Sequence, residues 1–166
     1  MRFKYCPDCG ALLTHRTLGD EVDVPWCEVC ARPWFDVFPC CVISLVYSRS
    51  GRVLLLRQSY ISSVYHNLVS GYITPGETAE DAAVREIKEE TGLDVLSLRS
   101  ARSWWFEKKQ MLMVGFMAEA DDSAPLTLSS EVDSAQWVDA SQAPSLVHPE
   151  GSISHALVDY FLSHQL

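Results

Sequence analysis

The sequence predicts an α+β protein in which a small cysteine-rich module precedes one larger domain of strands and helices. Two observations predict the larger domain: short apolar segments of strand-like composition run through most of the chain, and one capped, acidic helix pattern interrupts them. The third observation is a pair of Cys-x-x-Cys motifs near the start of the sequence. We therefore expect residues 1–36 to form the module and residues 37–166 to form the main domain.

The composition is that of a soluble globular protein. Of the 166 residues, 48% are hydrophobic, which is enough to build a packed core. No apolar run reaches the roughly 18–20 residues that cross a bilayer, and the first residues lack the apolar segment of a signal peptide, so we expect a cytosolic protein. The formal net charge of −9 argues against non-specific binding to nucleic acid, which depends on Lys and Arg. A phosphorylated small substrate stays open, because bound cations invert the local charge of an acidic site.

The N-terminal module is predicted to bind zinc. Cys6 and Cys9 form the first Cys-x-x-Cys pair, Cys27 and Cys30 form the second, and seventeen residues separate the two pairs. This spacing is typical of a zinc ribbon with four thiolate ligands, and a site closed by four protein ligands is structural, not catalytic. A module of about 36 residues buries too little surface to fold unaided, so zinc is expected to supply much of its folding free energy.

A redox dithiol pair and disulfide bonds are the alternatives for these four cysteines. A redox Cys-x-x-Cys usually opens a helix of a larger α/β unit, which this segment is too short to contain, and disulfides are rare in the cytosol. A ribbon can also contact nucleic acid or a protein partner, but this one has few basic residues. Cys40 and Cys41 open an apolar run and are expected in the core of the first strand, with a ligand role as the lesser alternative.

The main domain is predicted to follow an aromatic linker at residues 33–39. A Ser-Arg-Ser-Gly turn at residues 48–51 predicts a hairpin between the first two strands. The strands are expected at residues 40–47, 53–58, 68–73, 95–106, 111–120 and 135–139. An amphipathic helix is expected at residues 152–164.

The most informative stretch is the acidic helix pattern. Thr78 is a typical N-cap with Asp81 three residues later, and Gly92 stands where a helix ends. Val84, Ile87 and Thr91, with Ala83 beside them, are expected to pack on a sheet. On another face, three glutamates at i, i+3 and i+4 should converge, and such like charges cost about 0.2–0.5 kcal/mol per pair. A hard divalent cation such as Mg²⁺ would offset that cost. The three are Glu86, Glu89 and Glu90.

The stretch from Gly71 to Leu93 resembles the signature of the Nudix hydrolases, GX5EX7REUXEEXGU with U a bulky aliphatic residue. It matches at every specified position, and nine specified positions at fixed spacing make a chance match very unlikely. The matching residues are Gly71, Glu77, Arg85, Glu86, Ile87, Glu89, Glu90, Gly92 and Leu93.

This resemblance implies a fold, a reaction and a set of site residues. The implied fold is an α/β/α sandwich around a mixed β-sheet, and the implied enzyme cleaves a nucleoside diphosphate linked to another moiety. Glu86, Glu89 and Glu90 would hold Mg²⁺ or Mn²⁺, and Arg85 would orient carboxylates by pairing with Glu89 and Asp81.

Two further glutamates belong to the predicted site. Glu77 is either another metal ligand or the residue that holds the loop to the helix. Glu131 precedes a short strand, where relatives place a late metal-binding or general-base glutamate; a solvated loop glutamate is the alternative. Gly71 and Gly92 are expected to have backbone roles.

A zinc ribbon before such a domain resembles the NADH pyrophosphatase family, whose members split the dinucleotide into nicotinamide mononucleotide and AMP. That family carries SQPWPFPxS after the signature, whereas this chain has Trp104, Trp105 and Phe106 without the prolines. These aromatic side chains are expected either to stack on nicotinamide or adenine, or to lie in the sheet core or a dimer interface. The resemblance also suggests a homodimer.

Two other functions stay open. One is hydrolysis of ADP-ribose or another nucleoside diphosphate derivative. The other is a non-catalytic protein in which the main domain senses a nucleotide and the ribbon contacts a partner. The complete set of carboxylates favours an enzyme, because a sensor does not need metal-directed glutamates in register.

Overall fold

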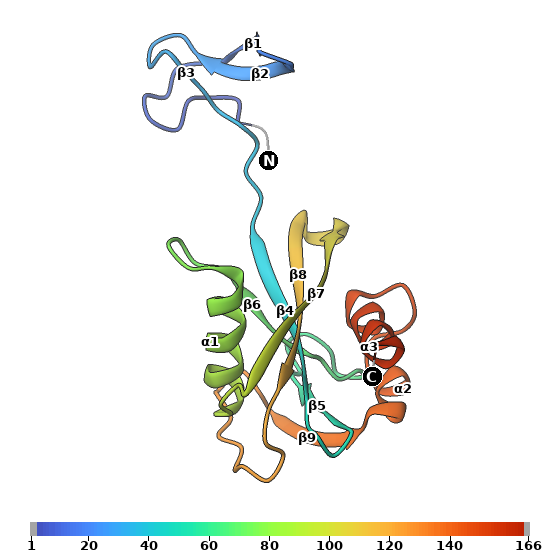
Figure 1. Cartoon of the computed structure of the whole chain (residues 1–166). Helices are drawn as coiled ribbons and strands as arrows, with labels where there is room; N and C mark the ends of the chain where they lie inside the picture. The colour runs from blue at the N-terminus through green and yellow to red at the C-terminus, as the bar shows by residue number, and fades with distance from the viewer. Residues whose placement is uncertain (1–2, 165–166) are drawn as a thin grey trace. The chain divides into compact units, whose positions relative to one another are not determined.

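The computed structural model describes residues 3–164 of the chain. It divides into two compact units, Met1–Phe38 and Pro39–Leu166. Figure 1 shows the course of the chain through both units. The boundary falls within the aromatic linker.

The first unit is a three-stranded antiparallel sheet. Strand β1 (Thr14–Leu18) and strand β2 (Glu21–Cys27) form a hairpin, and the two-residue strand β3 (Arg32–Pro33) pairs with β2. The tight turn of the hairpin contains Gly19 at φ 65°, a left-handed conformation that glycine adopts at little cost. The hairpin brings the second cysteine pair back to the first.

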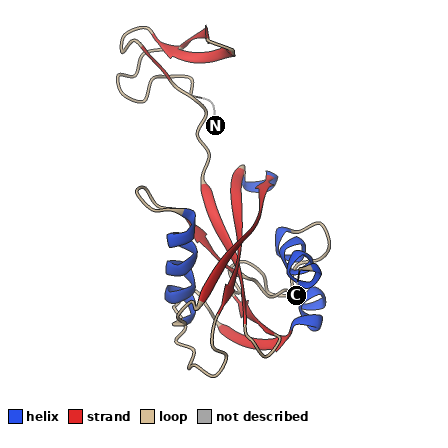
Figure 2. Ribbon diagram, viewed as in Figure 1, coloured by secondary structure: helices blue, strands red, loops and turns tan. Residues whose placement is uncertain are grey.

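The second unit contains one mixed sheet of six strands (Figure 2). Its strand order is β7-β8-β4-β5-β9, and β6 also pairs with β4. The central pair, β4 with β8, is parallel, whereas the other pairs are antiparallel. The strands are β4 (Cys40–Tyr47), β5 (Arg52–Arg57), β6 (Val69–Tyr72), β7 (Ser97–Phe106), β8 (Met111–Glu119) and β9 (Ser134–Asp139).

Helices cover both faces of this sheet, as the resemblance implied. Helix α1 (Ala79–Thr91) lies on one face, and α2 (Ala143–Leu146) and α3 (Ile153–Ser163) lie on the other (Figure 1). Two short 3-10 helices, η1 (Glu107–Lys109) and η2 (Ala140–Gln142), complete the elements. Helix α2 and the two 3-10 helices were not predicted; each is at most one turn long, too short for a visible helical repeat. Among the residues described, no helix is long and apolar enough to span a membrane.

Strand β4 shows how the sheet divides the core. Its alternate residues point to opposite faces, so Ile43 and Leu45 pack with the side chains of α3, whereas Val46 packs in the cluster that contains Ile87 of α1. Cys41 is buried in the same layer as Ile43, as predicted. Cys40, also predicted in the core, is only partly buried because it begins the strand.

Helix α1 begins and ends where the sequence predicts. The Thr78 hydroxyl accepts a hydrogen bond from the Asp81 backbone N–H, and Gly92 has a left-handed φ of 76°. The predicted buried face is wrong at one position: Val84 is 41% exposed, and Ala82 is fully buried in its place. A helix with small residues can lie close to a sheet, and its rotation about its own axis is set by contacts that the sequence pattern does not show.

Candidate functional site

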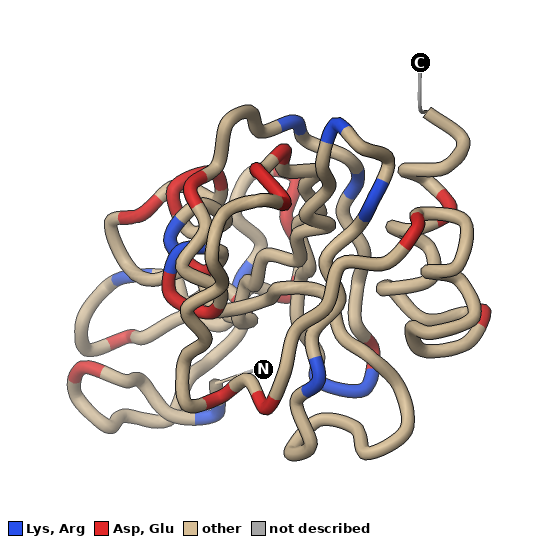
Figure 3. The backbone as a smooth tube through the Cα atoms, turned by 90° about the horizontal axis from the view of Figure 1, so that it is seen from below, with Lys and Arg blue, Asp and Glu red and all other residues tan. Residues whose placement is uncertain are grey.

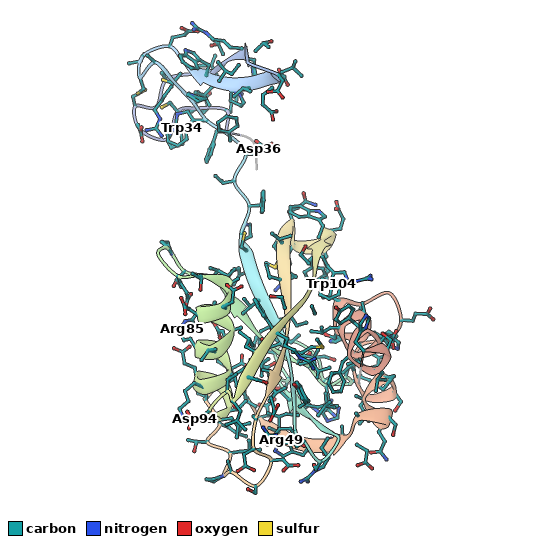
Figure 4. The ribbon with its side chains drawn as sticks, viewed as in Figure 1. Trp34, Asp36, Arg49, Arg85, Asp94 and Trp104 are labelled. Carbon is teal, nitrogen blue, oxygen red and sulfur yellow. The ribbon has the colours of Figure 1, made fainter. Side chains whose placement is uncertain are left out.

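Arg85 of α1, which is labelled in Figure 4, forms ion pairs with three carboxylates. Its guanidinium donates to both carboxylate oxygens of Glu77, with Nε–Oε1 2.7 Å and Nη2–Oε2 3.0 Å. Its Nη1 donates to Glu86 at 2.7 Å and to Glu89 at 3.0 Å, and Nη2 also reaches the Tyr72 carbonyl. One planar cation therefore orients three carboxylates, which suits the fork of guanidinium donors. Figure 3 shows the acidic and basic positions close together along α1.

One predicted contact of this network is wrong. Arg85 pairs with Glu89, as predicted, but the second predicted partner, Asp81, instead accepts a hydrogen bond from Thr78. The Arg85 side chain leans toward the loop before the helix, where Glu77 is placed. Glu77 also accepts from the backbone N–H and the hydroxyl of Thr74, so its geometry fits the role of holding the loop to the helix. The Arg85 guanidinium and the Thr74 N–H lower the pKa of Glu77 to about 2.

Gly71 of β6 makes room for the Glu86 carboxylate. A Cβ atom at Gly71 would lie 2.0 Å from Cδ and Oε1 of Glu86 and 2.3 Å from Oε2. The residue pairs with Val42 in the sheet register, so the strand cannot easily move away. Glycine is therefore needed here for close approach, not for an unusual φ.

Glu90 lies on a different side of α1 from Glu89 and is buried, with 5% exposure. Its Oε1 accepts a hydrogen bond from the amide of buried Gln58 at 3.3 Å, while its Oε2 has no partner. Burial and the charge of Glu86 raise the pKa of Glu90 to about 8. The three predicted glutamates therefore do not converge on one point: Glu86 and Glu89 contact Arg85, and Glu90 points into the interior.

Glu131 reaches this region through the loop before β9. The loop is tied to the C-terminal end of α1, because the Thr127 N–H donates to the Thr91 carbonyl at 2.9 Å and the Ser129 N–H donates to the Glu90 carbonyl at 3.3 Å. Glu131 lies close enough to raise the pKa of Glu90, after larger contributions from burial and Glu86. It also raises the pKa of Tyr60, after burial.

A single cavity of about 1260 Å³ brings these groups together. Its lining includes Glu86, Glu89 and Glu90 of α1, Glu131, and residues of the β7–β8 turn. Trp105 and Phe106 line it, and Trp105 is 46% exposed. Trp104 is not in its lining: the ring packs over Gly115, where a Cβ would lie 2.5 Å from Cζ3, in the layer under α3.

The four cysteines of the first unit come together as predicted. Their Sγ atoms all lie within 4.8 Å of one another, with 3.5 Å between Cys9 and Cys27 and 3.9 Å between Cys6 and Cys30. None of the four forms a disulfide. Gly10, at φ 74°, closes the turn after the first pair, and its N–H donates to the Cys6 carbonyl. Four converging thiol groups fit a tetrahedral zinc ion.

The carboxylates are less tightly gathered than the thiols. Within residues 3–164, the cysteines are the only set of three or more potential metal ligands whose atoms approach within 4.8 Å. The carboxylates nevertheless fit a divalent cation, because the buried Oε2 of Glu90 lacks a partner and Glu86 and Glu131 lie nearby. A cation would satisfy that oxygen and would act against the burial and the Glu86 charge that raise the pKa of Glu90.

The structure adds residues that the sequence did not single out. Gln58 holds one oxygen of Glu90 and Tyr60 lines the cavity beside Glu131, but both lie outside the signature. Lys108 and Lys109 also line the cavity. Nothing in the local pattern marks Gln58, which stands at the end of an apolar strand; the lysine pair was visible only as a charged turn.

Comparison with known proteins agrees with this geometry. The NUDIX domain family model matches residues 38–158. The NAD-capped RNA hydrolase NudC of Vibrio parahaemolyticus is 27% identical over 163 residues, covering 96% of this chain and 60% of the relative. The protein of the same name from Escherichia coli (strain SMS-3-5 / SECEC) is 29% identical over 160 residues, covering 94% and 59%. The chain thus spans about 60% of the length of these relatives.

Solved structures share the fold. A NUDIX hydrolase from Nitrosomonas europaea superposes with a TM-score of 0.71 and 18% identity, covering 98% of this chain and 94% of that one. The NUDIX domain of Shewanella oneidensis NrtR, solved in complex with ADP ribose, gives a TM-score of 0.64 and 14% identity, covering 78% and 89%. At such identities the likeness concerns the fold alone.

Proposed function

Because the chain belongs to the NUDIX family, we propose that it is a metal-dependent hydrolase that cleaves the diphosphate of a nucleoside diphosphate linked to another group. The proposed substrate is NADH or NAD, and the products are nicotinamide mononucleotide and AMP. One observation supports this type of reaction most directly. Carboxylates that Arg85 and Gln58 hold in place line one cavity, and the buried Oε2 of Glu90 has no hydrogen-bond partner.

We assign the roles of the site residues from their contacts. Glu86, Glu89, Glu90 and Glu131, which all line the cavity, would hold Mg²⁺ or Mn²⁺. When bound, such a cation offsets the negative charge of the diphosphate and lowers the pKa of a water molecule. Glu131, which is exposed on a loop and borders the cavity, is the candidate general base.

The remaining polar residues of the site would orient these carboxylates. Arg85 fixes Glu86 and Glu89, and Glu77 fixes Arg85 by a two-point ion pair. Gln58, which directly follows β5, fixes Glu90 by a hydrogen bond to its Oε1. Exposed ion pairs add little to the free energy of unfolding. The Arg85 side chain, however, is only 30% exposed, and because three carboxylates share its guanidinium, it limits how far they can turn.

The choice of a dinucleotide rests on the sequence relatives and on the cavity. The relatives are named NAD-capped RNA hydrolases. In this chain, Trp105 and Phe106 line the same cavity as the glutamates, and this aromatic surface supports the proposal that a nicotinamide or adenine ring stacks there. The four-cysteine site would bind zinc with a structural role, and we expect a homodimer.

A substrate panel tests the proposal. The protein is incubated with Mg²⁺ or Mn²⁺ and with NADH, NAD, ADP-ribose, FAD, a diadenosine polyphosphate, nucleoside triphosphates and a short NAD-capped RNA, and the products are resolved chromatographically. We expect NADH to give nicotinamide mononucleotide and AMP. Turnover of ADP-ribose without NADH would reject the dinucleotide assignment. No turnover of any compound would reject the enzyme, and binding without turnover would favour the sensor.

Glu89→Gln provides the matched test of the site. The substitution keeps the volume of the side chain and removes the charge that pairs with Arg85. Most of the activity should be lost while the circular dichroism spectrum is retained. Glu80→Gln is the control, because Glu80 is an exposed glutamate of the first turn of the same helix and does not line the cavity. Equal rates for the two variants would remove Glu89 from the site.

Zinc content tests the ribbon. Elemental analysis of freshly purified, reduced protein should find one zinc per chain, and its absence would overturn the assignment. Light scattering after size-exclusion chromatography reports whether the protein is a dimer.

A further inference from the structure

The β7–β8 turn places two lysines in the cavity. Lys108 and Lys109 form most of the 3-10 helix η1, and both line the cavity that also contains the glutamates of α1. The turn ends in β8, and β4 lies between β8 and β6 in the sheet (Figure 1). Gly71 of β6 lies against the Glu86 carboxylate. The chain has only four lysines, so half of them stand on this turn.

Among the lysines and arginines at residues 3–164, Lys108 and Lys109 differ from the others in having no ion pair, no side-chain hydrogen bond and no contact with an aromatic ring. Within the part of the chain that the structure describes, neither Lys108 nor Lys109 forms an ion pair or a hydrogen bond. Six other cations do pair with carboxylates, namely Arg16, Arg32, Arg49, Arg52, Arg85 and Lys88. In a protein with a net charge of −9, anionic partners are abundant, so two adjacent unpaired lysines need an explanation.

Glu107, the obvious intramolecular partner, is engaged elsewhere. Its Oε2 accepts a hydrogen bond from the Trp105 indole at 2.8 Å, and its Oε1 accepts one from the Gln110 amide at 2.8 Å. Gln110 also donates to the Glu107 carbonyl and adopts a left-handed φ of 51° at the end of the turn. These contacts fix the turn and engage both oxygens of the Glu107 carboxylate.

Lys109 also acts on a thiol that lines the cavity. Cys41 is part of the lining, and burial raises the pKa of its thiol to about 11. Lys109 acts in the opposite direction and lowers it, while Glu86 raises it further. A positive and a negative group therefore both act over the same buried position.

We propose that Lys108 and Lys109 form a phosphate subsite of the cavity, separate from the carboxylates of α1. The proposal rests on the proposed function in one respect, namely that a nucleotide enters this cavity. A phosphate suits the site because two mobile ammonium groups beside Trp105 can follow an anion while the indole contacts a base or ribose. The glutamates of α1 repel such an anion unless a cation is present, so the lysines supply the attraction that draws it into the cavity.

The phosphate that the lysines bind could come from two parts of a nucleotide, and three compounds distinguish them. It is either part of the diphosphate that is cleaved, which every candidate substrate carries, or a further phosphate outside that diphosphate. NADH carries the first only, and NADPH carries both. Nicotinamide riboside carries neither and reports whether the cavity is intact.

The test is binding of these three compounds, measured by calorimetry without added divalent cation, so that no turnover is required. The variant is Lys108→Gln with Lys109→Gln. The control, Arg49→Gln with Arg99→Gln, removes the same charge at exposed positions that do not line the cavity. We expect the lysine variant to raise the dissociation constant of at least one phosphorylated compound about fivefold or more at low salt, and less at high salt.

Each outcome decides the proposal. An equal loss for NADH and NADPH supports it and identifies the cleaved diphosphate, whereas a larger loss for NADPH supports it and identifies a further phosphate. Affinities equal to those of the control overturn it, as does a parallel loss for nicotinamide riboside, which would indicate a distorted cavity. If the protein hydrolyses no compound but binds them less tightly in the lysine variant, the hydrolase is rejected and the subsite is retained. If the protein hydrolyses substrate and the lysine variant binds as tightly as the control, the subsite is rejected and the hydrolase is retained.

Discussion

Replacing Gly71 with alanine should disable the site while leaving the fold intact. The added methyl group would lie 2.0 Å from the Glu86 carboxylate, far inside van der Waals contact. The strand is held by its register with Val42, which is fully buried, whereas the carboxylate is the free end of a side chain. Glu86 must therefore move, and the hydrogen bond from Arg85 Nη1 at 2.7 Å is broken.

The size of the effect follows from that bond. A hydrogen bond between charged groups contributes about 1.5–3 kcal/mol, and each 1.4 kcal/mol corresponds to about a tenfold change in rate. Loss of the Glu86 position should therefore lower kcat by about ten- to a hundredfold. Stability should change by much less, because alanine restricts the unfolded chain more than glycine and offsets about 0.4–1 kcal/mol of the strain.

A double-mutant cycle identifies the cause. Activity is measured for the wild type, Gly71→Ala, Glu86→Ala and the double variant, with thermal unfolding as the check on the fold. If the methyl group acts by displacing Glu86, it should have little further effect once the Glu86 carboxylate is absent. Full activity of Gly71→Ala, or the same loss from it in both backgrounds, would refute the reasoning.

The remaining predictions concern the groups around the glutamates and the ribbon. Arg85→Lys should lower kcat at least about tenfold, because lysine cannot make the two-point contact with Glu77, and a steady-state rate within twofold of wild type would contradict this. Gln58→Leu should lower kcat more than it raises KM, since it frees one oxygen of Glu90 without touching substrate; a change in KM alone would count against the role. Without added divalent cation, the free energy of unfolding should fall as pH rises from about 4.5 to about 8, because Glu90 stays protonated in the fold while the unfolded chain ionises. Glu90→Gln should flatten this dependence in chemical denaturation, and an unchanged profile would show that another group is responsible. Removing zinc by a chelator, or by Cys27→Ser, should expose the segment before residue 39 to proteolysis and spare the rest, whereas uniform resistance would show that the ribbon folds without metal.

Much of the fold and the chemistry could be predicted from local pattern. The apolar run at residues 40–47 predicts strand β4, whose two faces carry Ile43 and Val46, and the cap residues Thr78 and Gly92 set the ends of α1. The cysteine spacing predicted a cluster of four thiols, which the structure contains. These features depend on residues within one element or on one hairpin, where spacing along the chain largely determines distance in space.

The sequence by itself therefore determined the family, through the spacing of the signature, and the cluster of four cysteines in the first unit. Only the tertiary structure decided how the carboxylates are used. Arg85 pairs with Glu77 and not with Asp81, and Val84 is exposed to solvent. Glu90 accepts a hydrogen bond from Gln58, which lies thirty-two residues earlier in the chain. Such pairings depend on sheet register and on the rotation of a helix over the sheet, which are set by packing between distant segments. The same packing brings the lysines of the β7–β8 turn into the cavity of the glutamates.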